Sequence, residues 1–148
     1  MFYFAYGSNT NRTHISKNYP NVKFFSRGRL NNYKVVFRKV NSDLKMENSY
    51  CDVDTCADSV VDGVIYTLEK DDVLKLDKQE KEGVLYNRVL IDIQDEFNNT
   101  ISCYTYIMIK KDNAYSHPSL RYYRLVLDGY SEYGLNINQL IDAIKLVK

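Results

Sequence analysis

The chain has 148 residues, of which 20 are basic and 19 acidic, and its formal net charge at pH 7 is +1. This length predicts a single domain spanning residues 1–148, with a core large enough to enclose one pocket. Because the charges are balanced and not gathered into blocks, we expect no nucleic-acid partner. No run approaches the roughly 18 apolar residues of a membrane span, and the first residues lack the composition of a signal peptide, so we expect a cytoplasmic protein without a membrane partner.

The sequence contains no pattern that would hold a metal or a cofactor. Its three cysteines, Cys51, Cys56 and Cys103, are an odd number without ligand-like spacing, which favours reduced thiols over disulfides or a zinc site. It has neither a phosphate-binding loop nor a dinucleotide fingerprint. The sequence gives no basis for pairing either histidine, His14 or His117, with a nucleophile. We therefore expect no cofactor and no metal.

The chain opens with an apolar, aromatic run over residues 1–6, typical of a strand, which breaks into Gly7, Ser8 and Asn9. A strand that ends in such a turn can direct consecutive backbone N–H groups at one point and so bind an anion or an oxyanion. The same triplet is also an ordinary turn. Residues 9–18 predict a turn or one short helix, which Pro20 ends.

The next segments predict strands and a loop. Two β-rich runs, residues 21–30 and 33–39, predict strands joined by a hairpin at Asn31 and Asn32. Residues 41–59 are polar and aperiodic, which predicts a surface loop. Residues 60–68 predict a buried strand in which Gly63 lets another backbone approach closely.

A helix is predicted over residues 70–80, with Val73, Leu76 and Glu80 along one face. A carboxylate at this place would be partly desolvated, which would raise its pKa toward the range useful for proton transfer. The alternative is a solvated glutamate at a helix end, as structural carboxylates usually are.

The remaining elements complete an α+β pattern. Residues 85–93 and 100–109 predict strands separated by a hairpin over residues 96–99. Residues 119–133 predict a helix that stops at Gly134, and Asn136 is expected to cap a last helix reaching about residue 146. Because strands and helices do not alternate regularly, we predict a small mixed or antiparallel barrel-like sheet with helices at its edges.

Four motifs, in this order, resemble those of the γ-glutamylcyclotransferase family, and the resemblance runs almost end to end. They are Tyr6-Gly7-Ser8-Asn9, Gly63-Val64-Ile65-Tyr66, Leu76-Asp77-Lys78-Gln79-Glu80, and Pro118-Ser119-Leu120-Arg121-Tyr122 leading to Gly129 and Gly134. The resemblance implies a small mixed β-barrel with flanking helices. It also implies an enzyme that cyclises a γ-glutamyl amide to 5-oxoproline and releases an amino acid or amine.

The resemblance assigns roles to individual residues. It implies that Glu80 is the general acid/base and that Tyr122 borders the pocket. Binding of the γ-glutamyl moiety, largely through backbone N–H groups, would fall to Tyr6, Gly7, Ser8 and Asn9. The implied partner is a small-molecule γ-glutamyl substrate, and no cofactor is needed. Two alternatives are a γ-glutamylamine cyclotransferase and a non-catalytic small-metabolite-binding domain of the same fold.

The sequence departs from the family pattern at two places. The family usually has glycine directly after its catalytic glutamate, whereas Lys81 follows Glu80 here and Glu82-Gly83 comes next. A rival alignment therefore makes Glu82 the catalyst, but Glu80 keeps the Leu-Asp-x-x-Glu register. Residues 41–59 also lack the family's glycine-rich segment, which leaves substrate specificity open.

Overall fold

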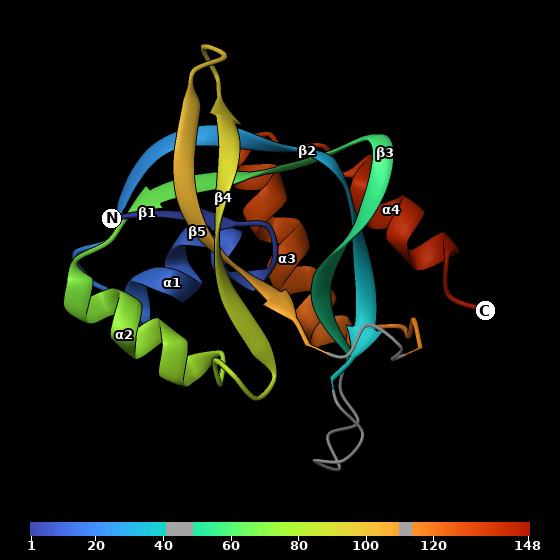
Figure 1. The fold of residues 1–148 in the computed structure, drawn as a ribbon. Helices are drawn as coiled ribbons and strands as arrows, with labels where there is room; N and C mark the ends of the chain where they lie inside the picture. The colour runs from blue at the N-terminus through green and yellow to red at the C-terminus, as the bar shows by residue number, and fades with distance from the viewer. Residues whose placement is uncertain (41–48, 110–113) are drawn as a thin grey trace.

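Five strands close into one barrel in the computed structural model, which describes residues 1–40, 49–109 and 114–148 (Figure 1). Their order around the barrel is β1-β3-β2-β4-β5. The strands are β1 (Phe2–Ala5), β2 (Lys23–Lys39), β3 (Ser49–Thr67), β4 (Tyr86–Asp95) and β5 (Thr100–Met108). β1 and β5 pair in parallel at Tyr3 and Tyr104, and the other pairs are antiparallel. The predicted mixed barrel is thus confirmed.

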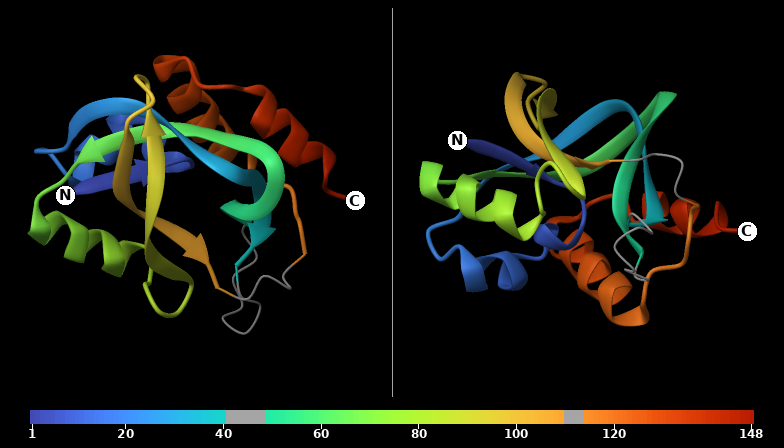
Figure 2. Two further views of the ribbon diagram at one scale, coloured as in Figure 1. Left: turned by 45° about the horizontal axis from the view of Figure 1, so that its top comes forward. Right: turned by 60° about the horizontal axis from the view of Figure 1, so that its bottom comes forward.

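The helices pack around this barrel (Figures 1 and 2). They are the 3₁₀-helix η1 (Ser8–Thr10), α1 (Arg12–Asn18), α2 (Lys70–Gln79), α3 (Leu120–Tyr133) and α4 (Asn138–Lys145). Helices α1 and α2 lie near the same end of the barrel, while α3 contacts η1 and α4 contacts β2. None of the helices in the described part of the chain has the length and apolar character needed to cross a membrane.

The predicted ends of α3 are confirmed, whereas the N-cap residue of α4 is Ile137 and not the predicted Asn136. The Ser119 hydroxyl accepts a hydrogen bond from Tyr122 N at 3.2 Å and caps α3, and Gly134, with φ of +66°, ends it in the left-handed conformation. Asn136 Oδ1 accepts from Asn138 N at 3.1 Å at the start of α4. Local capping chemistry therefore sets these boundaries.

The predicted hairpin at Asn31 and Asn32 is wrong. The chain does not reverse there, because β2 continues through both residues and pairs with β3 from Lys23 to Lys39. Asn32 adopts a left-handed φ of +64°, and residues 56–59 of β3 lie opposite it in an enlarged bulge. Asparagine adopts this conformation both in turns and in bulges. The two asparagines therefore predict a hairpin turn, whereas Asn32 lies in a bulge.

The predicted loop over residues 41–59 is wrong for residues 49–59, which form the first half of β3. Residues 41–48 lie outside the described part of the chain. The polar residues of this half of β3 have specific partners: the buried Asp52 accepts a hydrogen bond from Met108 N at 2.9 Å and lies 3.4 Å from Arg38 Nε. These buried hydrogen bonds and ion pairs satisfy the polar groups of the strand, although its polar sequence predicts an exposed loop.

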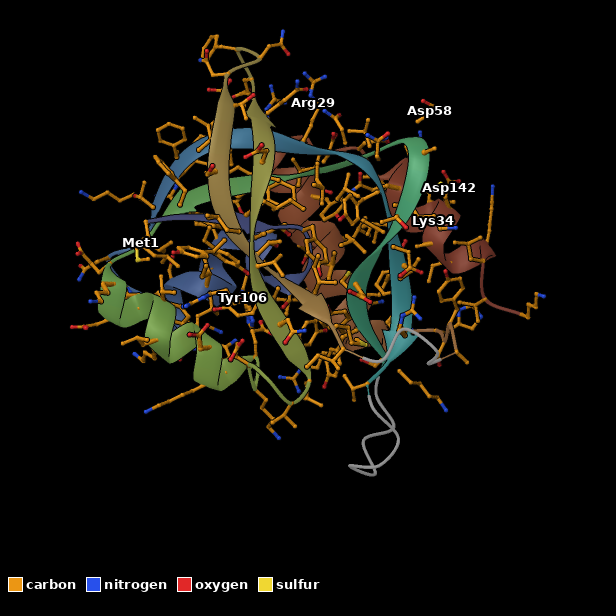
Figure 3. The ribbon with its side chains drawn as sticks, viewed as in Figure 1. Met1, Arg29, Lys34, Asp58, Tyr106 and Asp142 are labelled. Carbon is orange, nitrogen blue, oxygen red and sulfur yellow. The ribbon has the colours of Figure 1, made fainter. Side chains whose placement is uncertain are left out.

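The barrel interior is filled by aromatic and branched side chains. Figure 3 shows Tyr106 among packed side chains, whereas Lys34 and Asp142 lie at the periphery. At Gly63, a Cβ atom would lie only 2.4 Å from the carbonyl oxygen of Ala5, which confirms the predicted close approach of two strands. The fully buried large residues include Phe4, Tyr19, Leu30, Phe37, Ile65, Tyr66, Ile93, Tyr130 and Leu140.

Candidate active site

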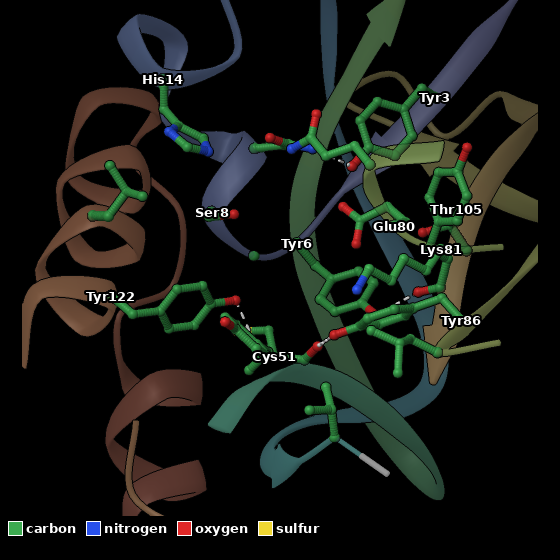
Figure 4. A pocket seen from close by; sticks show the side chains of 18 residues that line it. Tyr3, Tyr6, Ser8, His14, Cys51, Glu80, Lys81, Tyr86, Thr105 and Tyr122 are labelled. Carbon is green, nitrogen blue, oxygen red and sulfur yellow. Dashed lines mark hydrogen bonds between the residues drawn. The ribbon is translucent and has the colours of Figure 1, made fainter. Parts of the chain in front are cut away.

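A cavity of about 310 Å³ lies where the end of β1, the end of α2 and the first half of α3 meet (Figure 4). Such a volume suits a small metabolite. The structure brings all six predicted site residues to this cavity: Tyr6, Gly7, Ser8, Asn9, Glu80 and Tyr122. Glu82 is exposed and is not among the lining residues, so the two glutamates occupy different environments.

The turn after β1 is held through its carbonyl groups. Tyr130 Oη donates to the Tyr6 carbonyl at 2.6 Å, and Thr10 donates to the Gly7 carbonyl through both N, at 3.0 Å, and Oγ1, at 2.7 Å. Among the described residues, none accepts a hydrogen bond from the N–H groups of Gly7, Ser8 or Asn9. The first N–H groups of a helix have no partner within the helix, so this turn offers free donors beside the cavity.

Two glycines let other elements approach the turn. A Cβ atom at Gly7 would lie 3.1 Å from Cys51 Cβ and 3.3 Å from Tyr122 Oη. A Cβ atom at Gly129, in α3, would lie 2.3 Å from Thr10 Oγ1 and 2.6 Å from Asn11 N. Because both glycines lack a side chain, α3 and β3 can pack directly on the backbone of the turn.

Glu80 follows the last residue of α2, on the side of the buried Val73 and Leu76. Its N–H bonds to the Leu76 carbonyl at 2.9 Å, which keeps it in register with the helix. Figure 4 shows the Glu80 carboxylate directed into the cavity. Burial raises the pKa of Glu80 from 4.5 to about 7, because removal from water disfavours the charged form. A carboxyl group in this range can both accept and return a proton near neutral pH.

The residue after Glu80 ends the helix. Lys81 has φ of +49°, its N–H bonds to the Lys78 carbonyl at 3.2 Å, and the N–H of Glu82 bonds to the Asp77 carbonyl at 2.9 Å. This pair of bonds is a Schellman motif, in which the left-handed position is usually glycine. The reversal of the chain at Lys81 sends Glu82 into solvent and leaves Glu80 at the cavity.

Asp77 fixes the end of α2 to the barrel wall. Its side chain accepts a hydrogen bond from Tyr106 Oη at 2.6 Å, in β5, and forms an ion pair with Arg88 Nη1 at 2.8 Å, in β4. Tyr6 Oη donates in turn to the Tyr106 carbonyl at 2.6 Å. Asp77 lies one helical turn before Glu80, so these bonds also fix where the Glu80 carboxylate lies.

The wall opposite α2 is built on the backbone of Cys51. Tyr122 Oη accepts a hydrogen bond from Cys51 N at 3.0 Å, and Tyr86 Oη donates to Cys51 O at 3.1 Å. Burial raises the pKa of the Cys51 thiol to about 12, so it stays protonated and is a poor nucleophile. Tyr122 therefore helps to shape the cavity, and Cys51 does not supply a thiolate.

Asn9 has one free buried acceptor. Its Nδ2 donates to Tyr3 Oη at 3.1 Å, while its Oδ1 is buried and has no hydrogen-bond partner among the described residues. The negative charge of Glu80 contributes, after burial, to raising the pKa of Tyr3, so the carboxylate lies near this pair. A buried acceptor beside a carboxylate suits a cationic or N–H donor group.

Sequence reasoning did not assign the other lining residues, which include Lys81, Tyr86 and Tyr106. Lys81 followed from no pattern, because a lysine after a helix is usually solvated. The two tyrosines lie in β4 and β5, and strand alternation alone does not tell which face of a closed barrel borders a cavity. No grouping of three or more His, Cys, Asp or Glu able to hold a metal is found in the described residues.

These features define a small barrel protein with a cavity. A half-buried carboxyl group, that of Glu80, lies on one side of the cavity, and a turn with free N–H groups lies on the other. The family model described as gamma-glutamyl cyclotransferase, AIG2-like, matches residues 3–125. The gamma-glutamylcyclotransferase of Homo sapiens is 32% identical over 143 residues, 91% of this chain and 72% of the relative. That of Bos taurus is 30% identical over 142 residues, with the same shares.

A solved structure described as gamma-glutamyl cyclotransferase shares the fold. Its TM-score is 0.84 at 24% sequence identity, and the match covers 100% of this chain and 88% of that one. The match of the family model to most of the chain decides the assignment: the chain belongs to the γ-glutamyl cyclotransferase, AIG2-like family.

Proposed function

We propose that this protein cyclises a γ-glutamyl amide to 5-oxoproline and releases the amino acid or amine. The observation that carries the proposal is that Glu80, whose pKa burial raises to about 7, shares one cavity with the Gly7–Asn9 turn and its unpaired N–H groups. The family relationship supports the same reaction.

The first step activates the substrate's own amine. At neutral pH the α-amine of a γ-glutamyl compound is an ammonium, which has no lone pair for attack. The Glu80 carboxylate removes one proton. The amine nitrogen then attacks the γ-carbonyl carbon of the same molecule, and the new C–N bond closes a five-membered ring. Holding the flexible glutamyl chain in a folded conformation accelerates this closure.

The second step breaks the original amide bond. Attack places negative charge on the γ-oxygen, and the N–H groups of the Gly7–Asn9 turn stabilise it. The C–N bond to the leaving group then breaks as Glu80 gives its proton to the departing nitrogen, while the ring nitrogen loses its second proton, which the released amine takes up as an ammonium. The products are 5-oxoproline and a free amine, and Glu80 ends in its starting state.

The free acceptor of Asn9 supports this placement of the substrate. A cationic amine near Glu80 would also meet Asn9 Oδ1, which has no partner among the described residues. The ammonium would thus be held by two acceptors before it loses its proton. Asn9 and Glu80 would bind the α-amine, and the turn N–H groups would bind the oxygen of the reacting carbonyl.

The test is to incubate the purified protein with a panel of γ-glutamyl dipeptides and γ-glutamylamines and to measure 5-oxoproline. Release that disappears in Glu80→Gln supports the proposal. Release from the amines alone would establish the γ-glutamylamine alternative. Binding of panel members without release would establish the non-catalytic alternative, against which the raised pKa of Glu80 in the cavity already argues.

A further inference from the structure

The cavity contains a positive charge that the reaction proposed above does not use. Among the described residues that line it, Lys81 is the only lysine or arginine, and it forms no ion pair within 4 Å with any described acidic residue. Figure 4 shows its side chain directed into the cavity, below Glu80 and beside Tyr6. The other basic group, His14, has its pKa lowered from 6.5 by burial and therefore adds little charge near pH 7.

The backbone fixes where this lysine lies. Lys81 takes the left-handed position of the Schellman motif, directly after Glu80, and Asp77 anchors the same helix end to β4 and β5. A residue with a Cβ atom is disfavoured in this conformation relative to glycine. The Cα–Cβ bond of Lys81 therefore starts from a fixed point at the edge of the cavity.

We propose that Lys81 binds the carboxylate of the leaving amino acid, so that the protein prefers γ-glutamyl amino acids to γ-glutamylamines. The inference rests on the proposed function and deepens it. A lysine ammonium donates up to three hydrogen bonds and pairs strongly with a carboxylate when both are partly removed from water. Lys81 is exposed in the free protein, so a leaving amine without a carboxylate only forgoes this pairing, whereas a cationic one would be repelled.

The chemistry of the substrate matches the position of Lys81. In a γ-glutamyl amino acid the second carboxylate is attached to the carbon that bears the scissile nitrogen. Glu80 protonates this nitrogen in the proposed reaction, and Lys81 is the next residue in the chain. The α-carboxylate of the glutamyl moiety is instead attached to the carbon that bears the α-amine, the end of the molecule that the proposed reaction places beside Asn9.

The test compares γ-glutamylalanine with γ-glutamyl ethylamide, which differ only by the leaving-group carboxylate. We expect wild-type kcat/KM to favour γ-glutamylalanine at least tenfold. Lys81→Met keeps the length of the side chain and should lower this ratio about tenfold, whereas Lys81→Arg should keep most of it. Lys78→Met is the matched control, since Lys78 is an exposed lysine on the same helix outside the cavity, and its ratio should match wild type.

Two outcomes would overturn the inference. The ratio could be near one in wild type, or it could be the same in Lys81→Met as in wild type. In the second case, an equal fall of kcat/KM for both substrates would assign Lys81 to the glutamyl α-carboxylate that they share.

A binding measurement separates this inference from the proposed reaction. Calorimetric titration of Glu80→Gln with the same two compounds needs no turnover. If Glu80→Gln binds γ-glutamylalanine more tightly than γ-glutamyl ethylamide, and Glu80→Gln/Lys81→Met does not, the pairing of Lys81 with the carboxylate is supported. This holds even if the wild-type protein forms no 5-oxoproline, a result that would overturn only the proposed reaction. Turnover of both compounds without any preference in rate or binding overturns the role of Lys81 and leaves the reaction intact. Absence of both turnover and binding overturns both.

Discussion

Tyr106 donates a 2.6 Å hydrogen bond to Asp77 and so ties the helix that carries Glu80 to β5. Removing this hydroxyl in Tyr106→Phe should let the helix end shift, and a small displacement of a general base lowers the rate more than it weakens binding. We expect kcat to fall about tenfold with KM little changed in steady-state kinetics. Tyr104→Phe removes a hydroxyl from the same strand and should behave as wild type. A raised KM at unchanged kcat would show that Tyr106 contacts the substrate instead.

Replacement of Glu80 by glutamine keeps the shape of the side chain but removes its basic oxygen. Glu80→Gln should fold normally, bind substrate and lose 5-oxoproline formation by about 10²-fold or more, as is typical for a general acid/base. The exposed Glu82 provides the matched control, and Glu82→Gln should retain activity within about twofold. Reversed results for the two variants would assign catalysis to Glu82, and the alignment of the chain to the family motif would then shift by two residues.

The raised pKa of Glu80 also predicts a pH-dependent stability. The folded protein holds a proton on Glu80 up to about pH 7, whereas the unfolded chain releases it near pH 4.5. The free energy of unfolding should therefore fall, through this group, as pH rises from about 4.5 to above 7. A pKa difference of this size corresponds to on the order of 3 kcal/mol.

Glu80→Gln should remove this pH dependence. Urea denaturation should give equal stabilities for the variant and wild type near pH 4, and a more stable variant at pH 8. If the difference in the free energy of unfolding between the two proteins stayed constant from pH 4 to pH 8, the raised pKa of Glu80 would be contradicted. The rate should show the opposite trend in wild type, because kcat/KM requires the ionised base and should rise with pH through about 7.

The turn at Gly7 has no room for a branched side chain. A Cβ atom there would already lie 3.1 Å from Cys51 Cβ, and valine adds two methyl groups beside the N–H donors. Gly7→Val should raise KM by about tenfold or more in protein that still folds, as checked by circular dichroism and substrate titration. Gly7→Ala should show a smaller effect in the same direction. An unchanged KM in folded Gly7→Val would remove the turn from the binding site.

The helix end at Lys81 offers a test of backbone strain. Because φ is +49° there, Lys81→Gly should stabilise the protein by about 0.5 to 1 kcal/mol in urea denaturation. The same substitution at Lys78, inside the helix, should destabilise it by about 1 kcal/mol. A loss of stability at both positions would mean that packing of the Lys81 side chain stabilises the protein by more than its left-handed backbone conformation destabilises it.

The elements that depend on local chemistry were predictable from the sequence. The apolar face of α2 placed Glu80 at the cavity side, and the cap at Ser119 and the glycine at Gly134 set the ends of α3. Turn residues were a weaker guide. Asn32 marks a bulge in a continuous strand, since the local conformation of asparagine does not determine whether the chain reverses.

Features that depend on distant pairing were not predictable. The polar first half of β3 is ordered by partners such as Arg38 and Met108, which no local pattern connects to Asp52. The same holds for Tyr106, whose role depends on a hydrogen bond to Asp77 in another element. Lys81 was visible as a departure from the family pattern, but its place in the cavity follows only from the reversed backbone at the end of α2.

The parallel pairing of β1 with β5 determines when the cavity can exist during synthesis. The strand that ends in the Gly7 turn is made before its neighbours β3 and β5, and Tyr122 in the opposite wall is made later than all three. A nascent chain therefore carries the turn long before it can hold a substrate. A small molecule that binds in this cavity would therefore stabilise the closed barrel and none of its shorter precursors.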